Sequence, residues 1–264
     1  MSVYDDNLYD VNLFTIQDTR DDLRKVVNYF QSQPYHDRAM QAFLIETRNM
    51  PESVIKDSDA FYIDEECTVA DLPDWIVNNP SLGIVNKNYI PMAGRCVFPV
   101  KSAKGNIIGF CGWDPTIKPK YLDSKNYGYK AKATTFYGME NIYDYYINDK
   151  PIFIVEGLMC CRWLISQGFC AMASLGSVLT KYQIAILKRF GNRCCIIPDN
   201  DDGQDRAGEK FLTQVMFQVP KAQRFMVKYG KDIDGCRRDY AEPLIRDLSN
   251  VMTPSYKFEI LLRR

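Results

Sequence analysis

The sequence lacks the features that would place it in several protein classes. No run of about eighteen or more apolar residues is present, so a membrane span is not expected. The segment from Met1 to Asp10 is acidic, whereas a secretory signal begins with basic and then apolar residues. The only histidine, His36, lies on a predicted amphipathic helix, where a structural role is more common than catalysis. These absences favour a globular protein of the cytoplasm.

Paired cysteine spacing is missing as well. The chain has nine cysteines, but none of them forms a C-x-x-C pair, which excludes a zinc ribbon. The adjacent pairs Cys160-Cys161 and Cys194-Cys195 stand inside apolar runs. We therefore expect reduced cysteines that serve as small core residues.

Net charge is also absent, but the charges are distributed unevenly. Lysine and arginine together number 33, as do aspartate and glutamate. From Met1 to Trp75 there are 16 acidic against 6 basic residues, whereas from Lys87 to Lys132 there are 9 basic against 2 acidic residues. The second segment predicts a basic surface of the kind that binds a phosphate backbone, although a solvated face would have the same composition.

The first half of the chain is predicted to combine helices with a short β-hairpin. Apolar residues at helical spacing indicate helices over residues 21–30, 37–48 and 51–55. Two short apolar strands are expected at 95–100 and 107–111, and the turn residues of 103–106 join them into a hairpin. Residues 115–127 are rich in lysine and are predicted to form a loop.

From Pro151 onward, short apolar strands alternate with helices. Strands are predicted at 151–155, 169–174, 193–197 and 222–227. Helices are predicted at 158–167, 180–190 and 204–218. This alternation indicates a parallel α/β sheet with right-handed crossovers. The fold class is thus expected to be α+β in the first half and α/β, with a Rossmann-like parallel sheet, in the second.

Carboxylates follow three of these predicted strands. Glu156 comes directly after the first strand, Asp199 and Asp201 follow the third, and Asp232 and Asp234 follow the last. The carboxyl ends of parallel strands meet at one edge of a sheet, where clustered acids repel each other unless a cation lies between them. Oxygen ligands suit Mg²⁺ or Mn²⁺ rather than zinc. A single Asp-x-Asp is usually a turn or a helix cap, so only the combination favours a metal site.

The motifs of the second half resemble those of a Toprim domain. They are Ile-Phe-Ile-Val-Glu-Gly157, Ala173-Ser-Leu-Gly176, Pro-Asp199-Asn-Asp201 with Arg206-Ala-Gly208, and Lys231-Asp232-Ile-Asp234. The upstream motifs resemble the basic subdomain of DnaG-type primases. They are Gly94-Arg95-Cys-Val-Phe-Pro99, Gly105-Asn-Ile-Ile-Gly109, Pro119-Lys-Tyr-Leu122 and Phe136-Tyr-Gly138, preceded by opening helices between Ala42 and Ile55. Topoisomerases and nucleases share the Toprim pattern, whereas the upstream series is specific to primases.

The resemblance implies a primase catalytic core with four segments. They are an acidic N-terminal segment 1–24, a basic subdomain 25–150, a Toprim catalytic domain 151–240 and a short C-terminal segment 241–264. The implied activity is synthesis of short RNA primers from ribonucleoside triphosphates on single-stranded DNA, by nucleotidyl transfer that depends on Mg²⁺ or Mn²⁺.

The resemblance also implies roles for individual residues. The metal-binding carboxylates would be Glu156, Asp199, Asp201, Asp232 and Asp234, of which the first three are catalytic. The basic residues that hold nucleotide or template phosphates would be Arg95, Lys120 and Lys132.

Several positions depart from the family pattern. Cys160 stands where the family has an aspartate, and a thiol is a poor ligand for Mg²⁺. Additional acids, Asp202 and Asp205, leave open which residue accompanies Asp199 in its motif. Trp113 replaces a basic residue, either as a packed side chain or as a platform for a base. These departures keep two alternatives open: a degenerate core that binds single-stranded DNA or a replication partner without synthesis, and a Toprim nuclease.

The modules that usually flank such a core are not expected in this chain. No zinc ribbon precedes residue 25, and about two dozen residues follow Tyr240. A replicative helicase or a separate zinc-ribbon protein would then supply the corresponding functions. By analogy, the compact form suggests a phage or another mobile element.

Overall fold

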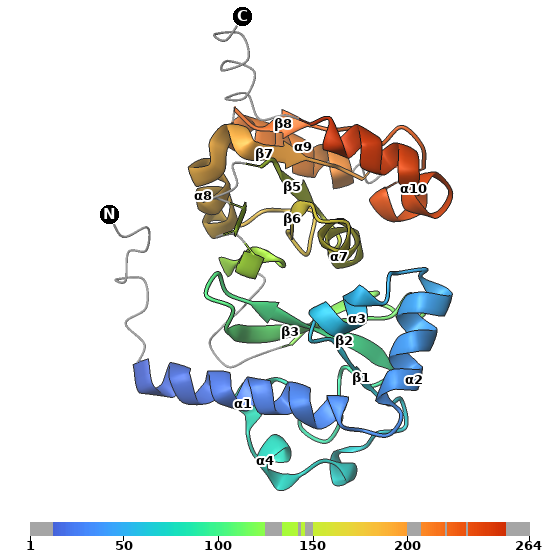
Figure 1. Ribbon diagram of the computed structural model, residues 1–264. Helices are drawn as coiled ribbons and strands as arrows, with labels where there is room; N and C mark the ends of the chain where they lie inside the picture. Colours follow the sequence, from blue (N-terminus) through green and yellow to red (C-terminus); the bar gives the residue numbers. More distant parts are fainter. Residues whose placement is uncertain are drawn as a thin grey trace, which may run out of the picture.

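Two four-stranded sheets of different type organise the chain. The computed structural model describes residues 13–124, 134–141, 144–145, 150–199, 207–219, 221–230 and 232–251. Each sheet carries its own helices, and together they form two lobes that meet at α3 and α7 (Figure 1). The mixed α+β and α/β fold class expected from the sequence is confirmed.

The first lobe is built on an antiparallel sheet with the strand order β1-β2-β3-β4. Its strands are β1 (Phe61–Ile63), β2 (Arg95–Lys101), β3 (Ile107–Trp113) and β4 (Tyr121–Asp123). The predicted hairpin is confirmed, since β2 and β3 pair from Cys96 opposite Trp113 to Lys101 opposite Ile107. The prediction of a loop over 115–127 is wrong for residues 121–123, which form β4 and pair with the end of β3. Three residues are too few to show the alternation of a strand, and the partner strand determines their conformation.

Helices cover both faces of this sheet and one end: α1 and α4 lie on one face, α3 lies on the face toward the second lobe, and α2 lies at the end (Figure 1). They are α1 (Leu13–Gln31), α2 (His36–Met40), α3 (Ser53–Asp57) and α4 (Asp74–Val77), with short 3₁₀ turns η3 (Val69–Asp71) and η4 (Pro80–Leu82). The apolar face predicted for α1 is buried, and the Phe30 ring stacks on Phe61 with centroids 5.1 Å apart. The helix predicted over 37–48 is α2 continued by a π-helical segment, η2 (Gln41–Thr47).

The second lobe is built on a parallel sheet with the order β6-β5-β7-β8. Its strands are β5 (Ile152–Val155), β6 (Cys170–Ala173), β7 (Cys194–Ile196) and β8 (Gln223–Arg224). Its helices are α7 (Leu158–Ser166), α8 (Lys181–Phe190), α9 (Ala207–Gln218) and α10 (Ile233–Ser249), with 3₁₀ turns η5 (Met139–Asn141) and η6 (Gly191–Arg193). The predicted parallel alternation is confirmed, although β8 is shorter than expected.

The last helix, α10, is an element that the sequence patterns did not predict. It bends at Tyr240, which has non-helical dihedral angles, and it contains Pro243. Proline lacks the N–H for the helical hydrogen bond and its ring crowds the preceding turn, which explains the bend. Leu244 and Leu248 are buried in the same cluster as α7, so the helix runs across the boundary expected at residue 240.

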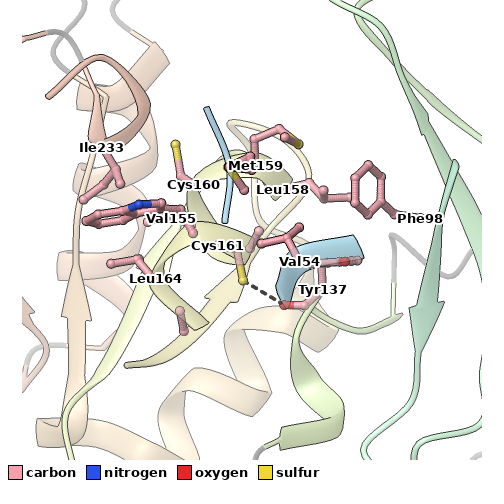
Figure 2. Packing of buried hydrophobic residues seen from close by; sticks show 14 of the residues in the cluster. Val54, Phe98, Tyr137, Val155, Leu158, Met159, Cys160, Cys161, Leu164 and Ile233 are labelled. Atoms are coloured by element: carbon pink, nitrogen blue, oxygen red, sulfur yellow. Dashed lines mark hydrogen bonds between the residues drawn. The ribbon is translucent and has the colours of Figure 1, made fainter. Parts of the chain in front are cut away.

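A short segment between the two lobes pairs with the parallel sheet and contacts the first lobe through the Tyr137 ring, which lies 6.4 Å from that of Phe98. Tyr137 pairs with Ala173 of β6 through two hydrogen bonds of 2.9 Å. Gly138 follows with φ +83°, and a Cβ atom there would lie 2.7 Å from the Ala171 carbonyl oxygen. Only glycine fits such a position, which gives the Phe136-Tyr-Gly138 motif a structural explanation. Figure 2 shows Tyr137 among the buried residues of both lobes.

The cysteines and the single histidine lie as expected. All nine cysteines are free, and eight of them are buried. The imidazole of His36 is 6% exposed, with Nδ1 3.1 Å from the Asp37 carboxylate and Nε2 3.4 Å from the Ala60 carbonyl oxygen. No helix within the described part of the chain is long and apolar enough to cross a membrane.

Candidate active site

Three of the predicted carboxylates lie at the carboxyl edge of the parallel sheet. Ile154 of β5 pairs with Ile196 of β7, so Glu156 and Asp199 follow two neighbouring strands at corresponding heights. Asp232 precedes α10, after the edge strand β8, and its Oδ1 accepts a hydrogen bond of 2.6 Å from the Gly235 amide. Glu156 is buried, while Asp199 and Asp232 are half-buried. The topology therefore gathers these acids as parallel strands should.

The Cys160 thiol lies near these carboxylates, whose charges act on it. It belongs to the first turn of α7 and is 6% exposed. Burial raises the pKa of Cys160 well above its usual range, and the charges of Asp232, Asp199 and Asp234 raise it further, in that order. Cys160 is consequently a neutral thiol at physiological pH, unsuited to bind a hard cation. Figure 2 shows its sulfur pointing away from that of Cys161, whose thiol is directed at the Tyr137 carbonyl oxygen.

Asp234 has different surroundings from the other acids. Its Oδ1 accepts hydrogen bonds from the guanidinium of Arg237, at 3.0 Å from Nε and 2.6 Å from a terminal nitrogen. Its Oδ2 accepts a short hydrogen bond from Arg48 and lies 3.4 Å from Arg238. Arg237 also donates to the backbone carbonyls of Arg48 and Asn49. Both carboxylate oxygens are thus engaged by arginines, one of which comes from the first lobe.

The first lobe reaches the acidic edge through β4 and the loop before it. A Cβ atom on Gly157 would lie 3.7 Å from the Tyr121 hydroxyl oxygen and 3.9 Å from the Cys160 sulfur. Burial, followed by the proximity of Cys160, raises the pKa of Tyr121, so the hydroxyl stays protonated beside the acids. Lys120, its neighbour, is exposed, with the ammonium 5.6 Å from the centre of the Tyr121 ring.

Arg95 and Trp113 are both buried next to this loop. The Arg95 guanidinium is 3% exposed and donates to the Lys120 carbonyl oxygen at 3.3 Å. Trp113 is fully buried, which excludes base stacking and confirms the packed alternative. The Arg48 guanidinium lies over the Trp113 ring, with its central carbon 5.1 Å from the ring centroid. This cation–π contact supports the arginine that binds Asp234.

Comparisons with known proteins agree with this arrangement. Residues 17–143 match the family model described as the N-terminal domain of the DNA primase catalytic core. The chain is 35% identical over 180 residues to the DNA primase of Clostridium acetobutylicum. Over these stretches the chain is similar to bacterial DNA primases. That alignment covers 64% of this chain and 29% of the clostridial protein, so the chain spans less than a third of that relative's length.

Solved structures show that the DnaG fold extends over both lobes. A DNA primase domain from Pseudomonas aeruginosa superposes with a TM-score of 0.73 at 21% identity, covering 92% of this chain and 83% of that one. A DnaG primase catalytic domain bound to single-stranded DNA superposes with a TM-score of 0.71 at 22% identity, covering 92% and 84%. The DnaG-type core expected from the motifs is therefore confirmed as a fold.

Two of the residues expected to act in this DnaG-type site, Asp201 and Lys132, lie outside the described residues, as do Asp202 and Asp205. Within the described ranges, no three histidine, cysteine, aspartate or glutamate side chains stand close enough to hold one metal ion. The oxygen donors of Glu156, Asp199 and Asp232 have the chemistry that suits Mg²⁺ or Mn²⁺. Asp234, with both oxygens engaged by arginines, does not offer a vacant donor of this kind.

The sequence reasoning missed three residues of this region. Tyr121 stands in the quoted Pro119-Lys-Tyr-Leu122 motif, but no role was expected for it. Arg237 could have been found, because it follows Asp234 by three positions at the start of a helix. Arg48 lies 186 residues before Asp234 and had no local signal.

Proposed function

We propose that this protein is a DNA primase that synthesises short RNA primers on single-stranded DNA. One observation supports this most directly: strand β4 of the first lobe meets the acidic edge of the parallel sheet, with the Tyr121 hydroxyl beside Gly157 and the exposed Lys120 next to it in the chain. The chain thus combines oxygen donors for a cation with a lysine-rich surface for phosphates, in a fold similar to DnaG catalytic cores. Nucleotidyl transfer requires both kinds of group.

Each side chain has a role in this reaction. Glu156, Asp199 and Asp201, together with Asp232, would hold Mg²⁺ or Mn²⁺, which when bound activates the primer 3′-hydroxyl and neutralises the triphosphate. The carboxylates also fix the orientation of the reacting groups, because strand ends position them rigidly.

Cationic side chains complete the proposed site on the other lobe. Exposed Lys120 and the predicted Lys132 attract the triphosphate and the template phosphates. Arg95, predicted for the same task, is buried and donates to the Lys120 carbonyl, so it fits the role of supporting the loop that carries Lys120.

The proposed partners follow from the activity. Single-stranded DNA is the template, ribonucleoside triphosphates are the substrates, and one of the similar structures is a DnaG catalytic domain with single-stranded DNA bound. A replicative helicase or a zinc-ribbon protein would select where synthesis begins.

A second candidate is a core that binds single-stranded DNA or a replication partner without synthesis. The neutral Cys160 thiol among the carboxylates favours it, because a thiol in that place contributes no ligand for a hard cation. Engagement of Asp234 by arginines removes a second donor.

Primer synthesis distinguishes the two candidates. The chain is incubated with single-stranded DNA, four ribonucleotides of which one is radiolabelled, and either Mg²⁺ or Mn²⁺, and the products are resolved on a denaturing gel. We expect short labelled oligoribonucleotides from the wild type and at least about a 100-fold loss with Glu156→Gln or Asp199→Ala. Asp239→Asn, which changes an exposed carboxylate of α10, is the matched control and should retain activity.

Negative results have a defined meaning. If product appears only after a helicase or a zinc-ribbon protein is added, the primase assignment stands and initiation depends on that partner. If no product appears even then, while single-stranded DNA is still bound, the binding module replaces the primase. Nicking of plasmid DNA in Mg²⁺ would instead indicate a Toprim nuclease.

A further inference from the structure

The Asp232-Ile233-Asp234 segment presents two carboxylates in contrasting environments. Asp234 is 7% exposed, and its two principal partners, Arg48 and Arg237, are 8% and 3% exposed. A cation that took Asp234 as a ligand would displace a buried guanidinium and leave that charge without a counter-charge. Such an uncompensated buried charge is strongly unfavourable.

The arginines around Asp234 connect segments that are far apart in the sequence. Arg48 ends the η2 segment and lies over the Trp113 ring of the first lobe. Arg237 donates to the carbonyl oxygens of Arg48 and Asn49 at 2.6 Å and 2.9 Å. Asn49 has a positive φ of 50°, so the turn that presents these carbonyls has a specific shape. Asp234 therefore ties the first turn of α10 to the opposite lobe.

Asp232 is the N-cap residue, directly before the first turn of α10. It is half-buried, and its carboxylate accepts the hydrogen bond from the Gly235 amide that caps α10. Among the nearby charges, that of Asp232 has the largest effect on the Cys160 thiol at the acidic edge. Ile233, between the two acids, is 1% exposed and anchors the segment in the core. Asp232 has extended backbone angles as the N-cap residue, whereas Asp234 lies in the first helical turn, so the two side chains have different surroundings.

We propose that Asp234 is a positioning residue and Asp232 the metal-side carboxylate: Arg48 and Arg237 hold Asp234, and this contact sets the start of α10 so that Asp232 stands at the acidic edge. The inference rests on the proposed function, since it divides the work of two carboxylates in that site. It also makes Arg48 and Trp113 supports of the site rather than contacts of the template.

Paired substitutions in the full chain test this division. Binding of Mn²⁺ is measured by calorimetry without nucleotide, and thermal unfolding is followed by circular dichroism. Asp232→Asn should weaken Mn²⁺ binding about tenfold and leave the melting temperature nearly unchanged. Asp234→Asn should lower the melting temperature by roughly 10 °C, because one partner of a buried ion pair is removed. Its Mn²⁺ affinity, measured below the transition, should fall by about threefold, less than in Asp232→Asn, because Asp232 is still present but is no longer held in place.

Two further variants complete the test. Arg48→Lys keeps a positive charge but loses the planar donor and the contact with Trp113. It should therefore lower the melting temperature and, like Asp234→Asn, weaken Mn²⁺ binding by about threefold, less than Asp232→Asn does. It serves in place of Asp234→Asn if that variant does not fold. Arg238→Gln is the matched control, because the Arg238 side chain is 47% exposed and lies 3.4 Å from Asp234, and it should change neither quantity.

The outcomes separate this inference from the proposed function. The inference is overturned if Asp234→Asn abolishes Mn²⁺ binding without lowering the melting temperature, if both asparagine variants weaken binding equally, or if the wild type binds no Mn²⁺. Neither measurement needs primer synthesis. A chain that divides the two roles as expected but makes no primer would refute the primase while leaving this assignment in place.

Discussion

The two lobes of this protein are joined at two places by different kinds of interaction. At the tyrosine junction, Phe136, Tyr137 and Gly138 dock on β6 through backbone hydrogen bonds and close packing. At the arginine junction, Arg48 and Arg237 surround Asp234 in a buried ion cluster. The first junction uses groups that every residue carries, together with one obligatory glycine. The second uses charges whose burial is favourable only when all of them are present.

The two junctions have different tasks: one holds the lobes together, and the other fixes the position of η2 against α10. The backbone bridge attaches Tyr137 to the edge strand β6, and the Tyr137 ring packs on Phe98 of the first lobe. Neither contact depends strongly on salt. The ion cluster costs desolvation, yet it prescribes one arrangement of η2 against α10, directly beside the acidic edge. The tyrosine junction therefore holds the architecture, whereas the arginine junction adjusts the site.

The largest effect is expected from a substitution that disrupts the tyrosine junction. Gly138→Ala should destabilise the protein by about 3 kcal/mol or more, because φ is +83° and the new Cβ would lie 2.7 Å from the Ala171 carbonyl oxygen. Urea unfolding measures the loss. Gly105→Ala is the matched control: its φ is +78°, but nothing lies within 4 Å, so it should cost only about 1 kcal/mol. Equal costs at both glycines would show that close packing at β6 contributes nothing.

A smaller effect concerns the polar contact within the same junction. The Tyr137 hydroxyl accepts a hydrogen bond from Nε of Arg162, a buried arginine whose terminal nitrogen lies 3.7 Å from Glu140. Tyr137→Phe should cost about 2 kcal/mol in urea unfolding, because a buried charged donor loses its acceptor. Tyr182→Phe, at an exposed tyrosine of α8, should be neutral. A neutral Tyr137→Phe would mean that the junction depends on backbone and shape alone.

The smallest effect sharpens the contrast between buried and half-exposed ion pairs. Asp59 lies 2.7 Å from Lys101 and 2.9 Å from Arg24. Burial alone would raise the pKa of Asp59, but Lys101 and Arg24 outweigh it and lower the pKa. Asp59→Asn should therefore cost about 1 kcal/mol at neutral pH, after allowance for solvent screening.

The pH dependence of this pair has a definite sign. Because the folded pKa of Asp59 is depressed, its stabilisation is complete above the unfolded pKa of about 4 and is lost as the pH falls through the folded pKa. Unfolding of wild type and Asp59→Asn, compared from pH 7 downward, should converge in acid. A difference that persists below both pKa values would assign the effect to packing.

Much of the fold could be predicted because its signals are local. The β2–β3 hairpin, the apolar face of α1 and the parallel alternation after Pro151 each repeat within a few residues. Four elements escaped: the three-residue strands β1 and β4, the four-residue helix α4, and α10, which carries Pro243 and bends at Tyr240. Elements this short show no periodicity, and α10 depends on neighbours in space.

The sequence by itself determined the acidic edge, since parallel strands that end in Glu156 and Asp199 must bring those ends together. Only the tertiary structure distinguished Asp232 from Asp234, two residues apart in one motif. The physical reason is desolvation: a buried carboxylate is stable only beside positive charges, and here one of those charges comes from Arg48 in the other lobe. Such a partner is invisible until the chain has folded.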